Sequence, residues 1–374
     1  MAEKARCRVA VLAFADARYD ARALNICRTL ASECNVTLWN TEPGSSSQWQ
    51  WRAVVVRRSG RMIMRWVRFV AKLIWRVLRT KVDVVWAADV YSLLPAVVLR
   101  WRWKARVVYD AREIYSSLGS LAQRPHAQRL LAWYERTLIR WVDRVVTSGN
   151  RDAEELTALL QLHTPPEVVL NVPFYATPIR SNRLREHCQI GQDAIVVLYQ
   201  GALHTGRGLL RAVEAIAQVD SAHLCILGDG ELADAIQYHA RRHGVANRVH
   251  LLGSVPYHEL LEWTASADIG WSWIEPITHS YELALPNKLF EYAMARVPVL
   301  ASDLPAMREV LRAYPFGVCC PTTATARELA EAILLLHAGA DEYRIYAERA
   351  AREFCYERQQ TKIRTLINEL CHRP

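Results

Sequence analysis

The sequence of 374 residues lacks any apolar run that approaches the roughly 20 residues a helix needs to span a bilayer. Its 15 glycines and 15 prolines are few for this length, which excludes collagen-like and low-complexity chains. We find no internal repeat, and this argues against a solenoid. The apolar run from Val9 to Ala15 stops at Asp16 and is too short for a secretory leader, so we expect a cytoplasmic protein.

The nine cysteines are scattered and include no Cys-x-x-Cys pair, the spacing typical of zinc knuckles and redox motifs. Cys319 and Cys320 are adjacent, which suits neither zinc ligands nor an ordinary disulfide. We therefore predict nine free thiols in a reducing compartment. The histidines show no metal-ligand spacing either, so we expect no metal site.

Acidic residues are missing from one stretch of the chain. Between Trp51 and Lys81 there are eight Arg and two Lys, but no Asp or Glu. These ten positive charges exceed the net charge of the whole chain, which is +9, so the remainder is near neutral. The positive charge is therefore concentrated in one segment, and its partner is expected to be an anionic surface.

Short β-branched runs alternate with longer helical stretches over residues 8–170, and the alternation restarts over residues 194–301. This pattern predicts parallel sheets with helices on both faces. Between the two regions, Asn171–Arg185 contains Pro173 and Pro178 and has no clear periodicity, as expected of an interdomain linker. We expect an α/β chain of two doubly wound, Rossmann-like domains facing a central cleft, with ligands outside the carboxyl ends of the strands.

The segment Leu285–Ala295 combines helix-start chemistry with charge. Pro286 and Asn287 are favourable residues at the start of a helix, whose free N–H groups can bind an anion. Lys288 adds a positive charge there, and Glu291, about one turn further, can accept hydrogen bonds from a ribose diol. A plain amphipathic helix with both charges solvated would show the same residues.

Two glycine-containing segments follow predicted strands. Tyr199–Gly208 carries three glycines and opens a helix, so its backbone can approach a phosphate that Arg207 could hold bidentately. Leu227–Gly230 is a Gly-Asp-Gly turn at the end of the next predicted strand. Each segment taken alone is also typical of an ordinary strand–helix turn.

The order of these segments resembles the donor-binding half of GT-B glycosyltransferases, most of all glycosyltransferase family 4. The glycine-rich loop and the Gly-Asp-Gly turn precede Leu252–Pro256, the helix at Leu285–Ala295 and the strand at Val297–Ser302. Segments of the N-terminal half are similar to the same family: Asp16–Arg18, Val82–Ala96, Val108–Glu113, Tyr134–Ser148 and Asn171–Pro173.

The resemblance implies a retaining hexosyltransferase that uses a UDP- or GDP-linked sugar and needs no metal or other cofactor. Arg207 and Lys288 would be its catalytic residues, because they would hold the diphosphate on which negative charge develops. Glu291 would bind the ribose, and backbone near Val255 would meet the nucleobase. The residues implied to bind the donor are Gly201, Val255, Glu282, Asn287, Leu289 and Glu291.

The resemblance also divides the chain by role. Residues 1–172 would form an acceptor and membrane-facing domain, residues 173–355 the nucleotide-sugar domain, and residues 356–374 a C-terminal helix that crosses back to the first domain. The acceptor would be lipid-linked or a glycan, as in polysaccharide, O-antigen or glycolipid biosynthesis. The residues implied on the acceptor side are Asp16, Arg18, Asp89, Arg112 and Glu113.

Four positions depart from the family pattern, and one of them is Arg296, where the family often has a glycine. Ala202 stands where the family often has Arg, and Arg112 stands where relatives show His. Leu283 stands where the family often has a Glu eight residues before Glu291, although Glu282 is one place away. The departures at Ala202, Leu283 and Arg112 leave open a non-catalytic GT-B scaffold or binding protein, and a sugar-nucleotide epimerase of the same fold is a further alternative.

Six basic residues between 61 and 79 are spaced 4, 3, 4, 4 and 3 apart and would share one face of a helix. A basic amphipathic helix with tryptophans suits an anionic membrane, which predicts a peripheral protein at the inner face of the cell membrane. A solvated surface helix is the alternative, and without an RNA-binding signature we expect no nucleic-acid partner. The predicted membrane residues are Arg61, Arg65, Trp66, Arg68, Lys72, Trp75 and Arg76.

Overall fold

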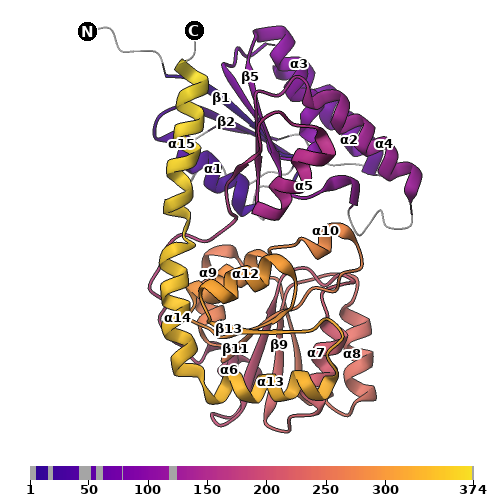
Figure 1. Cartoon of the computed structure of the whole chain (residues 1–374), viewed down its shortest axis with the longest axis vertical. Coiled ribbons are helices and arrows are strands. Elements are labelled where there is room, and N and C mark those ends of the chain that lie inside the picture. The colour runs from indigo at the N-terminus through magenta and orange to yellow at the C-terminus, as the bar shows by residue number, and fades with distance from the viewer. Residues whose placement is uncertain are drawn as a thin grey trace. The chain divides into compact units, whose positions relative to one another are not determined.

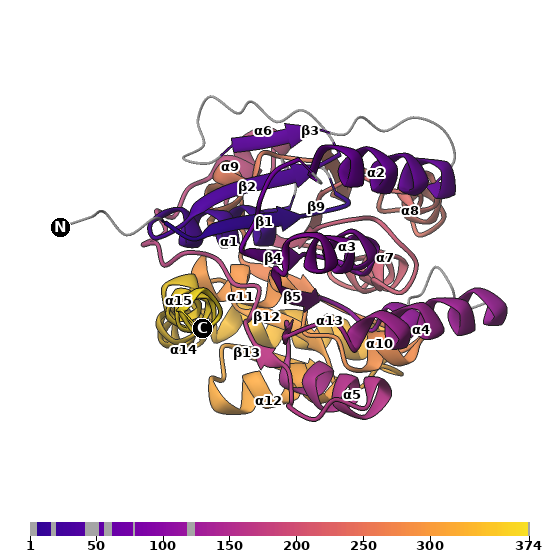
Figure 2. The same cartoon turned by 90° about the horizontal axis from the view of Figure 1, so that it is seen from above.

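The computed structural model describes residues 6–15, 20–41, 52–55, 62–77, 79–117 and 124–372. The chain divides into two compact units, each built on a parallel sheet of its own (Figure 1, Figure 2). Unit 1 comprises Met1–Asn171 and Arg358–Pro374, and unit 2 comprises Val172–Glu357. The predicted α/β class with two doubly wound, Rossmann-like halves is confirmed.

Unit 1 contains a seven-stranded parallel sheet in the order β3-β2-β1-β4-β5-β6-β7. The chain therefore builds the sheet outward from β1 in both directions, which places a topological switch point between β1 and β4. Sequence reasoning did not predict β3, because its four residues lie inside the basic stretch. The strands are β1 (Arg8–Leu12), β2 (Asn35–Asn40), β3 (Arg52–Val55), β4 (Val84–Ala87), β5 (Arg106–Ala111), β6 (Arg144–Thr147) and β7 (Glu167–Val168).

The helices of unit 1 cover both faces of this sheet, as a doubly wound fold requires. Strand side chains on one face, such as Leu12, Val85 and Tyr109, form a core with Phe69 and Leu73 of the basic helix α2 and with residues of α3, α4 and α5. Helix α1 belongs to the other face. The helices are α1 (Ala21–Ala31), α2 (Met62–Val77), α3 (Leu93–Trp103), α4 (Pro125–Ile139), α5 (Asn150–Leu160) and α15 (Tyr356–His372).

Unit 2 contains a six-stranded parallel sheet in the order β10-β9-β8-β11-β12-β13. All six residues of the central strand β8 are buried, as a continuous apolar run in a sheet covered on both faces should be. The strands are β8 (Ile195–Gln200), β9 (Ala222–Leu227), β10 (Val249–Gly253), β11 (Ile269–Ser272), β12 (Val299–Ser302) and β13 (Gly317–Cys320).

The helices of unit 2 include four that the sequence reading did not assign: α6, α10, α12 and α13. Helix α13 carries a capping box in which Thr325 and Glu328 bond each other's backbone amides, a pattern that is visible in the sequence. The helices are α6 (Arg183–Cys188), α7 (Leu209–Ala217), α8 (Ala233–Arg242), α9 (Tyr257–Ala265), α10 (His279–Glu282), α11 (Asn287–Met294), α12 (Pro305–Ala313), α13 (Ala326–Ala338) and α14 (Ala340–Glu353).

The last helix, α15, follows unit 2 in the chain but belongs to unit 1 from Arg358 onward. Because α15 packs in unit 1, its Cys371 lies close to Cys7, and the prediction of nine free thiols is wrong. Cys7 and Cys371 form a disulfide with their Cα atoms 6.1 Å apart, while the other seven cysteines are free. Sequence spacing could not indicate this bond, because the two cysteines lie 364 residues apart and meet only through the return of α15.

Among the described residues, no helix combines the length and the apolar character that crossing a membrane requires.

Candidate functional site

In unit 2, the loops after β8 and β9 lie at one edge of the sheet, because neighbouring parallel strands end on the same side. The amide of Gly201, directly after β8, donates to the carbonyl of Leu227 at 2.8 Å. A Cβ on Gly228 would lie 2.0 Å from the carbonyl oxygen of Gly201. The two loops can pack this closely only because residue 228 is glycine, so the Gly-Asp-Gly turn fixes the position of the glycine-rich loop.

Arg207 lies at the end of the glycine-rich loop and is half-buried. The loop backbone beside it packs on Trp273, since a Cβ on Gly208 would lie 2.1 Å from the indole ring. The guanidinium carbon of Arg207 lies 4.9 Å from the centre of the Tyr281 ring. This cation–π contact orients the side chain without neutralising its charge.

Lys288 is buried at the start of α11, where Pro286 caps the helix. Its Nζ lies 3.6 Å from the centre of the Tyr199 ring, and it faces the backbone of Gly201 closely enough that a Cβ there would lie 3.6 Å from Nζ. The helix start and the glycine-rich loop therefore meet at this amine. Both pieces of the predicted phosphate site are brought together in unit 2.

The electrostatics of Lys288 are unfavourable in the free protein. Burial lowers its pKa well below the usual range, the positive charge of Arg207 lowers it further, and Glu291 acts in the opposite direction. Within the described ranges, neither Lys288 nor Arg207 forms an ion pair with a carboxylate. An anion placed between the two side chains would remove this cost, so the arrangement fits a phosphate-bearing ligand.

Glu291 lies one turn after Lys288 and is held by the end of β8. Its carboxylate accepts a hydrogen bond from Nε2 of Gln200, whose Oε1 accepts one from the hydroxyl of Thr264 at 2.8 Å. Burial raises the pKa of Glu291, and the hydrogen bond from Gln200 and the charge of Lys288 lower it. The sequence reading missed Gln200, although its position at the end of a buried strand was a usable signal.

The other predicted donor residues occupy different environments. Val255 is half-buried in the loop after β10, and Asn287 is exposed at the first turn of α11. Leu289 is a core residue whose amide donates to the carbonyl of Pro286 at 3.0 Å. Glu282 is exposed on α10 and pairs with Nδ1 of His279 at 3.2 Å, so it is not held beside Glu291 by any bond of its own.

Ala202 and Leu283, where the chain departs from the family pattern, offer no side-chain polar group. The carbonyl of Ala202 accepts a hydrogen bond from the Tyr199 hydroxyl at 2.7 Å, which fixes the loop beside Lys288. Arg207 therefore supplies the side-chain cation of this loop.

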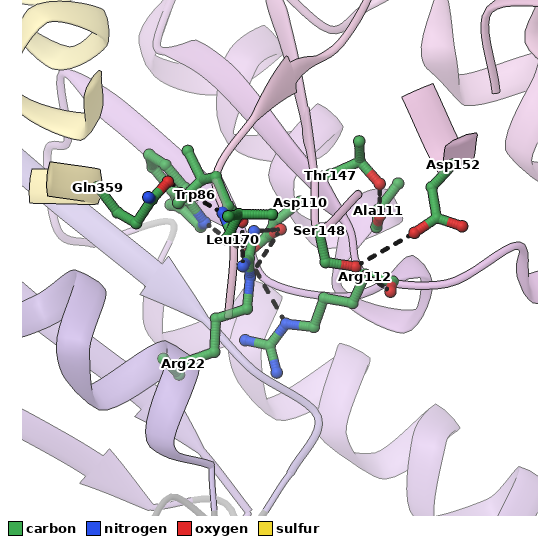
Figure 3. A network of polar contacts seen from close by, with 12 residues as sticks. Arg22, Trp86, Asp110, Ala111, Arg112, Thr147, Ser148, Asp152, Leu170 and Gln359 are labelled. Atoms are coloured by element: carbon green, nitrogen blue, oxygen red, sulfur yellow. Dashed lines mark hydrogen bonds and ion pairs between the residues drawn. The ribbon is translucent and has the colours of Figure 1, made fainter. Parts of the chain in front are cut away.

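In unit 1, a network of buried charges lies at the carboxyl end of β5 (Figure 3). Asp110 is fully buried, and both of its oxygens accept hydrogen bonds from Arg22 of α1, the shortest at 2.7 Å. Arg22 also donates to the carbonyl of Val169 at 2.6 Å. Trp86 completes the set, with its indole Nε1 3.4 Å from Asp110.

Arg112, two residues after Asp110, extends this network. Its Nη1 donates to both oxygens of Asp20 at 2.8 Å, and Asp20 also caps α1 by accepting from the amide of Ala23. Burial alone would lower the pKa of Arg112, but the carboxylates of Asp20 and Asp110 outweigh burial and raise it. Nη2 of Arg112 is buried and has no hydrogen-bond partner in the part of the chain that the structure describes.

The remaining predicted acceptor-side residues are dispersed. Asp89 accepts hydrogen bonds from the amides of Phe14 at 2.7 Å and Ser92 at 2.8 Å, and burial raises its pKa. Glu113 is exposed. The predicted residues Asp16 and Arg18 lie outside the described ranges.

Sequence reasoning did not single out the hydrogen-bonding residues that position Arg112. The hydroxyl of Ser148 donates to the carbonyl of Arg112 at 2.9 Å and lies 3.4 Å from Asp152 (Figure 3). Burial raises the pKa of Asp152 to about 7. Asp20 could have been found from the sequence, since an Asp directly before an apolar helical pattern is a helix-capping signal.

The predicted membrane residues of α2 do not share one environment. Trp66 is half-buried, and its indole donates to the carbonyl of Tyr91 at 3.0 Å. This bond fixes Trp66 to the segment just before α3. Arg68, Lys72 and Trp75 are exposed. Arg61 lies outside the described residues, and the side chains of Arg65 and Arg76 are likewise not described.

Exposed tryptophans also occur on the helices next to α2. Trp101 of α3 is 59% exposed and Trp133 of α4 is 63% exposed, comparable to Trp75 of α2 at 59%. Helix α3 contacts both α2 and α4. Unit 1 therefore carries exposed aromatic and basic residues on three successive helices, a feature that the linear sequence around α2 reveals only in part.

Several solved structures share this fold. Sucrose-phosphate synthase from Thermosynechococcus elongatus has a TM-score of 0.79 at 15% identity, over 98% of this chain and 99% of that chain. Anabaena HepE in complex with UDP has a TM-score of 0.73 at 15% identity, over 97% and 100%. WaaG, a glycosyltransferase involved in lipopolysaccharide biosynthesis, has a TM-score of 0.68 at 16% identity, over 95% and 98%. These likenesses define the fold as the GT-B type of glycosyltransferases.

Two family models then identify the family. The model described as "Glycosyl transferase 4-like domain" matches residues 3–174, and the model described as "Glycosyl transferases group 1" matches residues 194–338. The chain belongs to the family 4-like glycosyltransferases, as its sequence resemblance indicated. A comparison with curated proteins found no match.

Proposed function

We propose that this glycosyltransferase moves a hexose, with retention of configuration, from a UDP- or GDP-linked donor to a lipid-linked or glycan acceptor at the cytoplasmic face of the membrane. The observation that carries the donor part is the juxtaposition of Arg207 and Lys288 at the edge of the unit 2 sheet. Both are cations without a carboxylate partner in the described structure, and one of them is buried.

The chemistry of the reaction suits these two side chains. Cleavage of the sugar–phosphate bond leaves negative charge on the diphosphate, and cations that are already in place stabilise that charge without reorganising. A desolvated lysine interacts more strongly with this charge than a solvated one would, because the local dielectric constant is low. In this proposal Arg207 and Lys288 bear the charge of the leaving group, and no divalent metal is required.

Glu291 is positioned to recognise the sugar of the nucleoside. A carboxylate can accept hydrogen bonds from both hydroxyls of a ribose, and the bond from Gln200 fixes its orientation. Backbone around Val255, in the loop after β10, would contact the base. Anabaena HepE, which has the same fold, was solved with UDP and with UDP-glucose, and this supports a nucleotide-sugar donor.

Arg112 is our candidate for the polar contact to the acceptor or to the transferred sugar. Asp20 satisfies Nη1, whereas Nη2 retains an unused donor that a hydroxyl or carboxylate of a substrate could accept. The position is occupied by His in relatives that the sequence resembles. Arg112 replaces a group that can lose its proton with one that stays charged, so we expect it to bind and orient rather than to transfer protons.

The membrane part of the proposal rests on unit 1. Arg68 and Lys72 provide positive charge beside exposed Trp75, and Arg79 lies 4.2 Å from the Trp75 ring. Exposed Trp and basic residues are the side chains that favour an anionic membrane interface. We therefore place the membrane contact on the outer surface of α2 and its neighbours α3 and α4.

The function is tested by calorimetric titration with UDP and GDP, followed by assays with the corresponding sugar nucleotides. We expect one of the two nucleotides to bind, and we expect the anomeric proton of the product to show retained configuration by NMR, with no loss of activity in a chelator. Conversion of the donor to its epimer without an acceptor would instead favour the epimerase. Failure to bind either nucleotide would favour the scaffold and contradict the proposal.

A further inference from the structure

Three cysteines from distant parts of the chain meet at one end of unit 1. Cys7 directly precedes β1, Cys34 directly precedes β2, and Cys371 lies in the last turn of α15. Their Sγ atoms all lie within 4.8 Å of one another, and Cys34 is buried. Cys7 and Cys371 are joined in the disulfide, so Cys34 is a third sulfur beside an existing bond.

The positions of these cysteines are fixed by the fold as well as by the disulfide. Arg8 and Asn35 are paired in the parallel ladder of β1 and β2, and the amide of Asn35 donates to the carbonyl of Cys7 at 2.8 Å. Cys7 and Cys34 are therefore neighbours at the starts of adjacent strands. Removal of the disulfide would leave this pair in place.

Helix α15 is likewise held without the disulfide. Glu33, next to Cys34, accepts a hydrogen bond from Asn368 at 3.3 Å and pairs with Arg364 at 3.4 Å. Ile363 and Ile367 of the same helix are buried. The last turn of α15 is thus anchored to the turn that carries Cys34, and Cys371 stays beside the other two sulfurs.

We propose that the reduced form of this three-cysteine site (Cys7, Cys34 and Cys371) binds one thiophilic divalent cation, of which zinc is the natural candidate. Thiolate sulfurs bind zinc at about 2.3 Å in tetrahedral sites, which puts the sulfurs roughly 4 Å apart. Reduction lets the bonded sulfurs of Cys7 and Cys371 separate, and Cys34, whose sulfur lies within 4.8 Å of both, is close enough to complete that geometry by side-chain rotation. The fourth position would be left to water or another small ligand.

The chemistry balances in two steps. A dithiol reductant gives two electrons and two protons to the Cys7–Cys371 bond, which becomes two thiols while the reductant becomes a disulfide. The cation then forms three metal–sulfur bonds as the three thiols release their protons to solvent. In a reducing compartment, where a disulfide does not persist, the metal would take over as the cross-link between α15 and the starts of β1 and β2.

The test uses the full chain, reduced with a phosphine and freed of the reductant without air, and titrated with Co²⁺ alone. We expect one equivalent to bind with sulfur-to-cobalt charge-transfer absorption, and Zn²⁺ to abolish that absorption by displacement. Cys34→Ala should weaken binding at least tenfold. Under oxidation this variant still forms the Cys7–Cys371 disulfide, which shows by mass that the chain has folded. The oxidised wild type should give no charge-transfer band.

Two controls separate this site from other metal donors. Glu214, His239 and His243 of unit 2 also bring their ligand atoms within 4.8 Å of one another, so His239→Ala removes that competing set and should leave the sulfur absorption unchanged. Cys188→Ala removes the thiol that lies 3.9 Å from Cys225 and should likewise have no effect. Absence of the band in the reduced wild type, or an unchanged band in Cys34→Ala, would overturn the proposal.

Discussion

The two units treat positive charge in opposite ways. In unit 1, Arg22 and Arg112 lie against Asp110 and Asp20, so the cations are neutralised by carboxylates of the same unit. In unit 2, Arg207 and Lys288 lie against the faces of tyrosine rings and each other's positive charge. The first arrangement connects elements of the protein, and in our proposal an anionic ligand completes the second.

This difference suggests different roles for the two sets of charges: the pair of Arg22 and Asp110 holds unit 1 together, whereas Arg207 and Lys288 are our candidates for binding a ligand. Removal of one member of a buried ion pair leaves an uncompensated charge, so such a substitution strongly destabilises the fold. A buried cation without a partner costs stability in the free protein and recovers that cost on binding.

The largest effect is expected from breaking the pair in unit 1. Arg22→Leu leaves the fully buried Asp110 without its main partner, and we expect a loss of about 3–5 kcal/mol in the free energy of unfolding, measured in urea. The matched control is Arg8→Leu, which breaks a largely exposed pair with Asp83 and should cost about 1 kcal/mol or less. Equal losses in both variants would contradict the distinction.

Glu135 provides a counterpart to Lys288 inside unit 1, because it is a buried acid without a cation partner among the described residues. Burial raises its pKa from the ordinary 4.5 to about 7, against the hydrogen bond from the Tyr109 hydroxyl. The folded state therefore keeps a proton that the unfolded state loses above pH 4.5, so this contribution to stability falls as pH rises from 4.5 to about 7 and levels off above that.

Glu135→Gln removes this titration and keeps an acceptor for Tyr109. We expect the variant to be more stable than the wild type above neutral pH, by up to about 3 kcal/mol, with a flatter dependence of unfolding free energy on pH. Denaturant titrations at several pH values measure both quantities. A wild type whose stability rises between acid and neutral pH more steeply than that of Glu135→Gln would refute the assignment.

The unit 2 side of the comparison is tested by turnover. Lys288→Ala and Arg207→Ala should each reduce kcat at least tenfold, about 1.4 kcal/mol or more, because each removes charge that stabilises the leaving diphosphate. Arg211 is the matched control, since it is a nearby arginine that already pairs with Glu275 at 3.3 Å. Arg211→Ala should leave kcat close to that of the wild type.

Features that depend on neighbouring residues in the chain could be predicted from the sequence, whereas contacts between distant segments could not. The strand–helix alternation gave both doubly wound units, and the helix at Leu285–Ala295 gave Lys288 and Glu291 in their observed places on α11. Contacts between distant segments were not readable: the pairing of Arg22 with Asp110 depends on how α1 crosses β5, and no periodicity encodes it. The disulfide of Cys371 was missed for the same reason.

Helix α2 shows that spacing predicts a helix but does not predict the environment of each of its side chains. Spacing correctly predicts a helix there, but it treats Trp66 and Trp75 as equivalent interface residues. The structure turns Trp66 toward Tyr91 and leaves Trp75 exposed, a difference that depends on the packing of α2 against α3.

The smallest effect per substitution is expected at the membrane surface. Arg68→Glu with Lys72→Glu should weaken binding to vesicles that contain phosphatidylserine by about 1 kcal/mol or more per position, and should not change the weak binding to neutral vesicles. Arg327→Glu makes the same charge reversal at one exposed position of helix α13 in unit 2 and should leave binding nearly unchanged. Sedimentation with the two kinds of vesicle would measure this, and an equal loss in the control would remove the assignment to unit 1.

The proton balance of nucleotide binding, measured by calorimetry in buffers of different ionisation enthalpy, tests the central claim most directly. Because the pKa of Lys288 is lowered in the free protein and a diphosphate would raise it, binding should take up a proton, and affinity should fall as pH rises. Lys288→Arg keeps the charge and should bind without this uptake, which corrects for protons bound by the nucleotide itself. Identical proton balance in wild type and Lys288→Arg, with an affinity that does not change with pH, would contradict the account.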